Sequence, residues 1–193
     1  MSSQFFGAAG ADSDTRPGND FFPSFTRGEM MDRRRRTAAM MKEQGLDALV
    51  IYGGFGVLSA SPGGQTNMIW LANYGACIQG YLVVARDGEL TLVLRIAHHI
   101  ANAKDLTFID DVRAHYSIAE GVVERLRELG AEKGRIGIVG PHVGRPATRI
   151  TIPVEHHRTI TGGLPNATLV DASDPYEALR YVRTSEELDL LRK

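Results

Sequence analysis

The sequence predicts a three-layer α/β/α fold, in which helices cover both faces of a mixed, mainly parallel sheet of about six strands. Apolar runs typical of strands alternate with runs of helical periodicity along much of the 193 residues, which is the pattern of an α/β layer fold. Residues 46–95 hold three strand-like runs, and Asp87-Gly88 joins two of them. Asp-Gly between apolar runs is a strong hairpin signal, so at least one pair of strands is antiparallel and the sheet is mixed.

Composition excludes several classes of protein. The chain is 43% hydrophobic and 23% charged, with a net charge of −1, so no excess of positive charge points to nucleic acid or an anionic membrane. No run approaches the roughly 18 apolar residues of a membrane span. Cys77 is the only cysteine, which excludes an intrachain disulfide and a cysteine-based zinc site. The first residues lack the features of a signal peptide, so we expect a cytoplasmic location.

Residues 1–28 are predicted to form an N-terminal arm. Their Gly, Ser, Asp and Pro content is typical of disorder, yet they hold five of the seven phenylalanines, and each would gain a few kcal/mol from burial. Two interpretations stay open: the arm packs on its own domain, or it docks on a partner subunit or another domain. The five are Phe5, Phe6, Phe21, Phe22 and Phe25.

The first helix is expected to begin at Thr26 and to end at Gly45. Thr26 and Glu29 fit a capping box, and Gly45 fits a helix stop signal. Residues 33–36 are four consecutive arginines. At 100° per residue they point to most sides of the helix, so Arg34 or Arg35 lies near its apolar stripe. Such a run is usually a solvated face with buried stems; the alternative is an ion-pairing interface.

The next elements surround a glycine-rich segment. Residues 47–52 form a strand, and residues 53–65 are a flexible loop that lacks the pattern of a phosphate-binding loop. Residues 67–74 are predicted to be a short strand or extended segment that holds the only tryptophan, Trp70. Residues 80–85 and 90–95 are the two strands of the hairpin.

The second half continues the alternation. Ser117 and Glu120 fit a second capping box before a helix with apolar residues at helical spacing that ends at Gly130. Residues 141–161 are ambiguous, but Pro153 favours a helix that ends at Gly162-Gly163. The remaining expectations are a helix at 98–104, strands at 107–112, 135–139 and 168–171, and a helical run from 176 to 193.

No constellation of catalytic or metal-binding residues is predicted. The histidines come in adjacent pairs, His98-His99 and His156-His157, and neighbouring side chains on a helix or strand diverge too far to chelate one ion. Asp110-Asp111 diverge for the same reason. There is no nucleophile elbow and no complete dinucleotide fingerprint.

Four segments carry a resemblance to a known family. The chain is similar, from about residue 31 to 193, to the creatinase/prolidase N-terminal domain of the pita-bread metallopeptidase-like family. Residues 67–74 resemble its "N-x-x-Y-L-T-G-F/Y" segment, and residues 179–188 resemble its "L-R-x-x-K-S-x-E-E-I" signature. Residues 38–50 and 81–94 resemble its opening junction and central hairpin. The departures are Trp70 for Tyr, Asn73 for Gly and Arg183 for Lys.

The resemblance implies a fold with a ribonuclease H-like motif and a division into an arm (1–28), the domain (29–178) and the start of a linker helix (179–193). In the family a catalytic domain comes next, and it holds two divalent metals, Mn, Co or Zn. Lys193 lies where that domain would start, and none of its ligand motifs can be placed on this chain. We therefore expect a non-catalytic domain, without a cofactor of its own, of an Xaa-Pro peptidase or creatinase-like hydrolase.

The family's N-terminal domain supports a homodimer or higher homo-oligomer and covers the active site. This implies candidates for substrate capping or for an interface, although a core position is the simpler interpretation of Trp70 alone. Two other functions stay open: a stand-alone α/β module that binds a small ligand at loop 53–65, and a protein–protein scaffold. The candidates for substrate capping or for an interface are Phe55, Trp70, Asn73, Tyr74, Arg34, Arg35, Phe21, Phe22 and Phe25.

Overall fold

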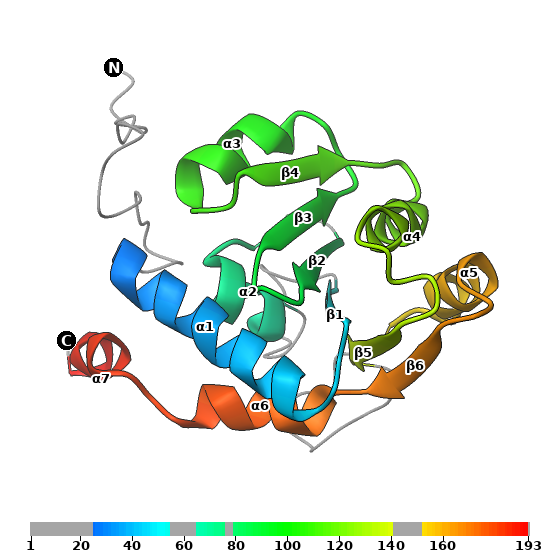
Figure 1. The fold of residues 1–193 in the computed structure, drawn as a ribbon. Coiled ribbons are helices and arrows are strands. Elements are labelled where there is room, and N and C mark those ends of the chain that lie inside the picture. The colour runs from blue at the N-terminus through cyan, green and yellow to red at the C-terminus, as the bar shows by residue number, and fades with distance from the viewer. Residues whose placement is uncertain (1–24, 55–64, 76–78, 141–151, 193) are drawn as a thin grey trace, which may run out of the picture.

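A computed structural model describes residues 25–54, 65–75, 79–140 and 152–192. The described residues do not include Phe21, Phe22, Phe55, Cys77, most of loop 53–65 or the segment 141–151. The expectations for them therefore stay predictions. The described part forms one six-stranded sheet in the order β4-β3-β2-β1-β5-β6 (Figure 1). Its strands are β1 Ala48–Gly53, β2 Gly80–Ala85, β3 Leu90–Leu94, β4 Asp111–Ala114, β5 Arg135–Val139 and β6 Thr168–Asp171.

The sheet is mixed and mainly parallel, as predicted. β2 pairs antiparallel with both β1 and β3, while the pairs β3–β4, β1–β5 and β5–β6 are parallel. The predicted hairpin joins β2 and β3, and Gly88 takes a φ of 92° in its turn, a conformation that favours glycine. A Cβ at Gly88 would lie 3.4 Å from the Cβ of Ala38, so the turn also packs closely against the first helix.

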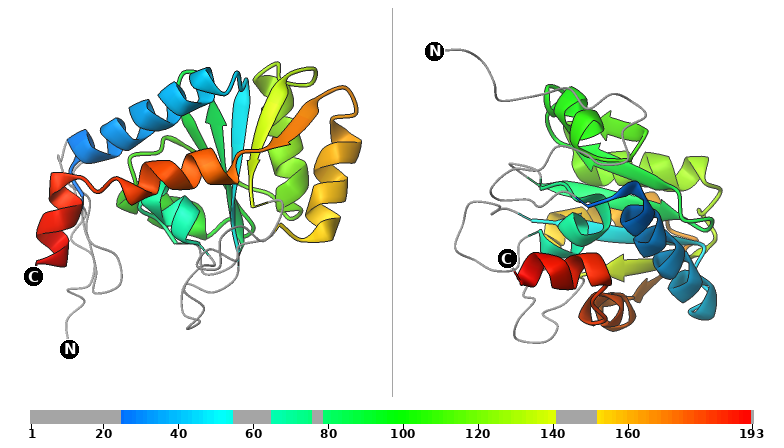
Figure 2. Two further views of the ribbon diagram at one scale, coloured as in Figure 1. Left: turned by 90° about the horizontal axis from the view of Figure 1, so that it is seen from below. Right: turned by 90° about the vertical axis from the view of Figure 1, so that its left-hand side faces the viewer.

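Helices cover both faces of the sheet (Figure 2). Side chains of β1 alternate between the two layers: Leu49 and Ile51 pack with one helical layer, Val50 and Tyr52 with the other. The first layer contains α1 Arg27–Glu43, α2 Thr66–Ala72, α3 His99–Leu106 and α6 Ser173–Tyr181; the second contains α4 Ile118–Glu128 and α5 Val154–Gly163. The three-layer α/β/α prediction is confirmed.

The N-cap threonine and the stop signal of α1 agree with the prediction. The Thr26 hydroxyl accepts the N–H of Glu29, and Gly45 has a φ of 63°. The N–H groups of Gly45 and Leu46 donate to the carbonyls of Lys42 and Met41, which is the Schellman arrangement. The predicted stop at Gly130 is likewise correct, with a φ of 70°. Ser117 does precede α4, but its side chain makes no cap hydrogen bond; its N–H donates instead to Nδ1 of His115.

Residues 67–74 were expected to be extended, and this is wrong. They contain most of α2, which buries Met68, Leu71 and Ala72, an i, i+3, i+4 pattern typical of a helix. The helix ends at Asn73, which takes the left-handed conformation with φ 53° and ψ 32°. A seven-residue helix offers too short a pattern to be distinguished from a buried strand by periodicity.

Two other expectations need correction. The strand expected at 107–112 begins only at Asp111, because the Thr107 hydroxyl accepts the N–H of Ile109 in a local turn. The helical run expected from 176 to 193 is two helices, α6 and α7 Ser185–Leu191, since Val182 and Thr184 are extended and Thr184 caps α7. The helix favoured for the ambiguous segment 141–161 is present as α5, which begins after Pro153 at its N-cap and ends at Gly163.

Candidate functional site

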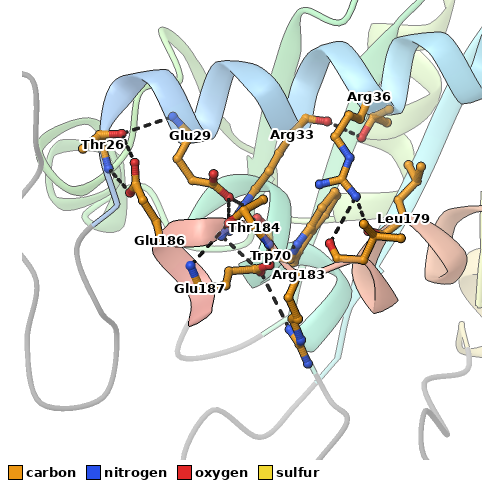
Figure 3. A network of polar contacts seen from close by, with 12 residues as sticks. Thr26, Glu29, Arg33, Arg36, Trp70, Leu179, Arg183, Thr184, Glu186 and Glu187 are labelled. Atoms are coloured by element: carbon orange, nitrogen blue, oxygen red, sulfur yellow. Dashed lines mark hydrogen bonds and ion pairs between the residues drawn. The ribbon is translucent and has the colours of Figure 1, made fainter. Parts of the chain in front are cut away.

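A network of buried and partly buried polar contacts joins the first and last described helices across α2 (Figure 3). Arg33 of α1 lies at their centre and is almost fully buried. Its Nε donates to Oε1 of Glu29 at 2.6 Å, and its Nη1 donates to the carbonyl oxygen of Trp70 at 2.7 Å. Its Nη2 donates to Oε1 of Glu187 in α7 at 3.2 Å. One guanidinium therefore connects three helices.

Aromatic rings surround the same guanidinium. The Arg33 Cζ lies 4.1 Å from the ring centroid of Phe25 and 5.4 Å from that of Trp70. A cation over an aromatic face in a desolvated site contributes on the order of 2 kcal/mol. The rings and the two carboxylates together replace the water that this charge loses on burial.

The N-termini of α1 and α7 exchange hydrogen bonds. The Thr26 hydroxyl and N–H donate to the two carboxylate oxygens of Glu186, the N–H at 3.1 Å. In return the Thr184 hydroxyl donates to Oε1 of Glu29 at 3.0 Å. Each helix therefore places a glutamate beside the N-cap threonine of the other, where the helix dipole also favours a negative charge. In the predicted capping box of α1, the Thr26 N–H would donate to Glu29. It donates to Glu186 instead, while Glu29 accepts hydrogen bonds from Arg33 and Thr184.

Glu187 is the most heavily bonded carboxylate of this group. Its Oε1 accepts from Arg33 and from the Trp70 indole N–H at 3.2 Å, and its Oε2 accepts the N–H of Thr184 at 3.0 Å. Arg183 lies 3.7 Å from Oε1. We call this group of residues the α1–α7 clasp. It comprises Thr26, Glu29, Arg33, Thr184, Glu186 and Glu187.

Next to the clasp, α2 is bonded to α6. The Tyr176 hydroxyl donates to the carbonyl oxygen of Asn67 at 2.8 Å, and Arg180 donates to the Asn67 side chain. The rings of Trp70 and Tyr176 meet edge to face, with centroids 5.8 Å apart. The segments 67–74 and 179–188, which lie far apart in the sequence, thus contact each other through both the clasp and these bonds.

Comparison with known proteins assigns the chain to the same family that segments 67–74 and 179–188 resemble. A family model described as the creatinase/prolidase N-terminal domain matches residues 33–182. The chain belongs to this family. Creatinase from Bacillus sp. (strain B-0618) is 25% identical over 177 residues, covering 88% of this chain and 38% of its own.

Solved structures show the same fold. Xaa-Pro dipeptidase from Bacillus anthracis matches with a TM-score of 0.62 and 15% identity over 84% of this chain and 39% of its own. The N-terminal domain of the cytoplasmic peptidase PepQ from Mycobacterium tuberculosis H37Rv matches with a TM-score of 0.55 and 23% identity, over 77% of this chain and 98% of its own. This chain therefore spans about two fifths of the full-length relatives.

The candidate residues of this creatinase/prolidase N-terminal domain do not gather in one place. Trp70, Asn73 and Tyr74 are all buried; Trp70 contacts the clasp, and Asn73 ends α2. Phe25 is buried against Arg33 and packs with Met30 and Phe108 of its own domain. The one phenylalanine of the arm that the structure describes therefore agrees with the first of the two interpretations. Phe21, Phe22 and Phe55 lie outside the described residues.

Arg34 and Arg35 have polar partners outside the clasp. Arg34 donates to the carbonyl oxygen of Phe108 at 2.5 Å, and burial lowers its pKa. Arg35 is exposed and pairs with Asp32. It lines a hollow of about 620 Å³ together with Ala38, Ala39, Lys42, Gly45, Leu46 and Arg86.

The prediction from the arginine run missed its most important member. Arg33, Glu29 and Glu187 were not among the candidate site residues, although two signals were present in the sequence. Glu29 and Arg33 have the i, i+4 spacing of a helical ion pair, and Thr184-x-x-Glu187 has the spacing of a capping box. Neither signal says that the two pairs meet.

The described residues offer no metal centre. No group of three or more His, Cys, Asp or Glu side chains among them could hold a metal ion. The rings of His98 and His99 lie against each other, with centroids 4.5 Å apart. Asp111 bonds to Thr91 and Arg113.

A second cluster of titratable groups lies where α5 covers the sheet. The Tyr81 hydroxyl lies 3.1 Å from Nδ1 of His156, and the rings of Tyr52 and Tyr81 are 5.0 Å apart. Burial raises the pKa of Tyr52 to about 12 and the pKa of Tyr81 further, while it lowers the pKa of His156. Both phenols stay protonated at neutral pH.

None of the helices in the described segments has the length and apolar character that a membrane crossing requires.

Proposed function

We propose that this chain is the non-catalytic N-terminal domain of a longer metallohydrolase, an Xaa-Pro peptidase or a creatinase-like enzyme. The observation that carries the proposal is the family match over residues 33–182, together with relatives of which this chain spans only 38–39%. Those relatives are named creatinase and Xaa-Pro dipeptidase. Fold alone does not fix the reaction, so both substrate classes are retained.

In this proposal the chemistry belongs to a domain beyond residue 193. That domain would hold two divalent metals, Mn, Co or Zn, while the arm (1–28), the domain (29–178) and the linker helix (179–193) supply structure. The clasp supports this division of roles, because it fixes the first turn of α7 to α1 through Glu186 and Glu187. A domain attached to α7 would then leave in one defined direction.

We further propose that the domain serves homo-oligomerisation and covers the active site of the assembled enzyme. Arg35, which is exposed, and the aromatic residues Phe21, Phe22 and Phe55 are the candidates for direct contact. Trp70, Asn73 and Tyr74 are buried, so they would act by positioning α2. A cytoplasmic location is supported by the single cysteine and by the likeness to the N-terminal domain of a cytoplasmic peptidase.

The test is to express the 193-residue chain and the full reading frame from the same gene. Both are assayed on Xaa-Pro dipeptides and on creatine with Mn²⁺, Co²⁺ or Zn²⁺. We expect metal-dependent hydrolysis from the longer protein and none from the 193-residue chain. Hydrolysis by the pure 193-residue chain would contradict the proposal, and light scattering that finds a monomer at every concentration in the longer protein would contradict the oligomerisation role.

A stand-alone module that binds a small ligand is the second candidate. The hollow beside α1 supports it, because about 620 Å³ lies within the range of small-molecule sites. A ligand that raises the melting temperature of the 193-residue chain in a concentration-dependent manner would favour this function. The substitution Ala39→Trp, which fills the hollow, should then abolish the shift.

A further inference from the structure

The hollow beside Arg35 lies between the second half of α1 and the turn that joins β2 and β3. Its volume of about 620 Å³ is within the range of small-molecule sites. Its two walls are packed together, since a Cβ at Gly88 in the turn would lie 3.4 Å from the Cβ of Ala38 in α1. We call this space the α1 hollow. It is therefore framed by two elements that fix each other's position.

The lining of the α1 hollow combines small apolar side chains with a positively charged rim. Positions 35, 38, 39 and 42 share one face of a helix, so Arg35 and Lys42 flank the two alanines between them. Leu46 adds apolar surface, and Arg86 adds a third cation from the turn. No acidic residue belongs to the lining that the described residues provide. The space therefore favours a ligand with an apolar body and a negative charge.

A neighbouring hollow of about 640 Å³ lacks this excess of positive charge. Arg86 lines both hollows. The neighbour has one further cation, Lys133, but it also has two acids, Asp47 and Asp87, so its charges balance. Because complementary charge decides where a charged ligand binds, an anion is expected in the α1 hollow rather than in its neighbour.

The three cations of the rim keep the capacity to bind a ligand. Arg35 pairs with Asp32, and Arg86 is paired in the same way with Asp47. A guanidinium carries five N–H donors, so one ion pair leaves donors for a ligand. Lys42 is exposed and has no ion pair within the described part of the chain. Its ammonium group is thus available in full.

The C-terminal end of α1 borders the hollow, and a helix dipole disfavours an anion at such an end. Two features reduce this effect. The carbonyls of Met41 and Lys42 are already bonded to the N–H groups of Leu46 and Gly45. The Lys42 side chain also lies in the last turn, where a cation offsets the dipole.

We propose that the α1 hollow binds a small organic carboxylate. The apolar body of the ligand packs on the two alanines and Leu46, and its carboxylate meets the rim formed by Arg35, Lys42 and Arg86. The inference goes beyond the proposed function, because every residue of this site belongs to the 193-residue chain and none takes part in hydrolysis. It also gives the second candidate function a class of ligand.

The experiment titrates the ¹⁵N-labelled 193-residue chain with indole-3-acetate and, as a neutral probe of the same shape, with indole-3-acetamide. The isolated chain is a suitable sample, since the similar N-terminal domain of PepQ was solved as a separate chain. We expect indole-3-acetate to shift the amides of residues 38–46 and 86 saturably. It should bind at least about fivefold more tightly than the amide, the effect of a few exposed ion pairs. This difference should shrink in about 1 M salt.

Three variants locate the site. Ala39→Trp fills the hollow and should abolish saturable binding; Ala39 is exposed, so the variant should keep its fold, which thermal unfolding checks. Arg86→Gln should weaken binding of indole-3-acetate by about twofold to fivefold and leave binding of the amide unchanged. Lys133→Gln is the matched control, since it removes an exposed cation of the neighbouring hollow and should leave both probes unaffected.

Three results would overturn the inference. One is the absence of saturable shifts with indole-3-acetate up to about 10 mM, above the range of weak specific binding. Another is equal affinity for the acid and the amide, which would mean that the cations do not contribute. The third is an equal loss in Arg86→Gln and Lys133→Gln, which would indicate attraction to surface charge without a site. The hydrolysis assays test the proposed function separately, and neither outcome depends on the other.

Discussion

Two charge networks of similar geometry lie in opposite environments in this domain. In the clasp, Arg33 meets Glu29 at 2.6 Å, and the side chains are 2% and 7% exposed. On the outer strand β4, Arg113 meets Asp111 at 2.7 Å and Glu128 of α4 at 2.7 Å, with 34%, 32% and 47% exposed. The distances are nearly equal, so geometry alone does not separate the two networks.

Burial gives the networks different roles. A surface pair gains little, because water and salt screen it and two long side chains lose freedom. A buried pair is costly to leave incomplete, since removal of one partner leaves an unpaired charge at low dielectric. The surface network thus places charges on the edge strand β4, and such charges discourage the strand from pairing with other chains. The clasp, in contrast, holds α7 against α1.

The substitution Arg33→Met tests the comparison with the largest expected effect. It removes the charge that Glu29 and Glu187 share, so we expect the free energy of unfolding to fall by about 3–5 kcal/mol, the range for a broken buried ion pair. Urea unfolding at pH 7 measures it, and the fluorescence of Trp70, the only tryptophan, reports the clasp directly. The neighbour Arg35 is exposed, so Arg35→Met should change stability by no more than about 0.5 kcal/mol. Equal losses in the two variants would remove the distinction between buried and exposed arginine.

The substitution Glu187→Gln is expected to have the next largest effect. The amide keeps the shape of the side chain but removes the charge that Arg33 faces, and hydrogen bonds to charged groups contribute about 1.5–3 kcal/mol. We expect a loss of that size in urea unfolding, together with faster hydrogen exchange of α7. Asp189→Asn is the control, because Asp189 lies on the same helix and is largely exposed. A loss in the control as large as in Glu187→Gln would show that any added amide perturbs α7.

The substitution Trp70→Phe separates the hydrogen bond from the packing. Phenylalanine retains an aromatic face for Arg33 but lacks the indole N–H that donates to Glu187. We expect a loss of about 1.5 kcal/mol, the lower end of the range for a hydrogen bond to a charged group. Circular dichroism monitors the unfolding, since the variant has no tryptophan. In the Glu187→Gln background the same substitution should cost less, and additive losses would contradict a shared contact.

The contrast between the networks also explains what the sequence could and could not predict. Strands β1, β5 and β6 and the hairpin were predictable because their apolar runs and the Asp87-Gly88 turn are local features. The clasp was not, because Arg33 and Glu187 are 154 positions apart and helical spacing alone cannot say which arginine of four meets a second helix. The helix α2 was missed for a similar reason: its seven residues are defined by contacts with α6 and the sheet.

The surface network should give the smallest effect and the clearest dependence on pH. Burial alone would raise the pKa of Asp111, but hydrogen bonds from Arg113 and Thr91 outweigh it, so the pKa lies below the ordinary value. The hydrogen bond from Arg113 likewise lowers the pKa of Glu128. The unfolded chain therefore takes up protons first as the pH falls, and the stabilisation is present above about pH 4.5 and lost as the pH falls through the folded-state values.

We expect Arg113→Met to lower the free energy of unfolding by less than about 1 kcal/mol at pH 7, the range for exposed pairs. The loss should shrink in about 1 M salt, where screening is strong, and disappear as the pH drops below the folded pKa values of Asp111 and Glu128, where the carboxylates no longer carry charge. Arg192→Met, which removes the exposed partner of Asp189 at the end of α7, is the matched control. A loss for Arg113→Met that stays constant between pH 7 and pH 3 would mean that Arg113 acts through its packed stem, and the two networks would then differ in kind as well as in burial.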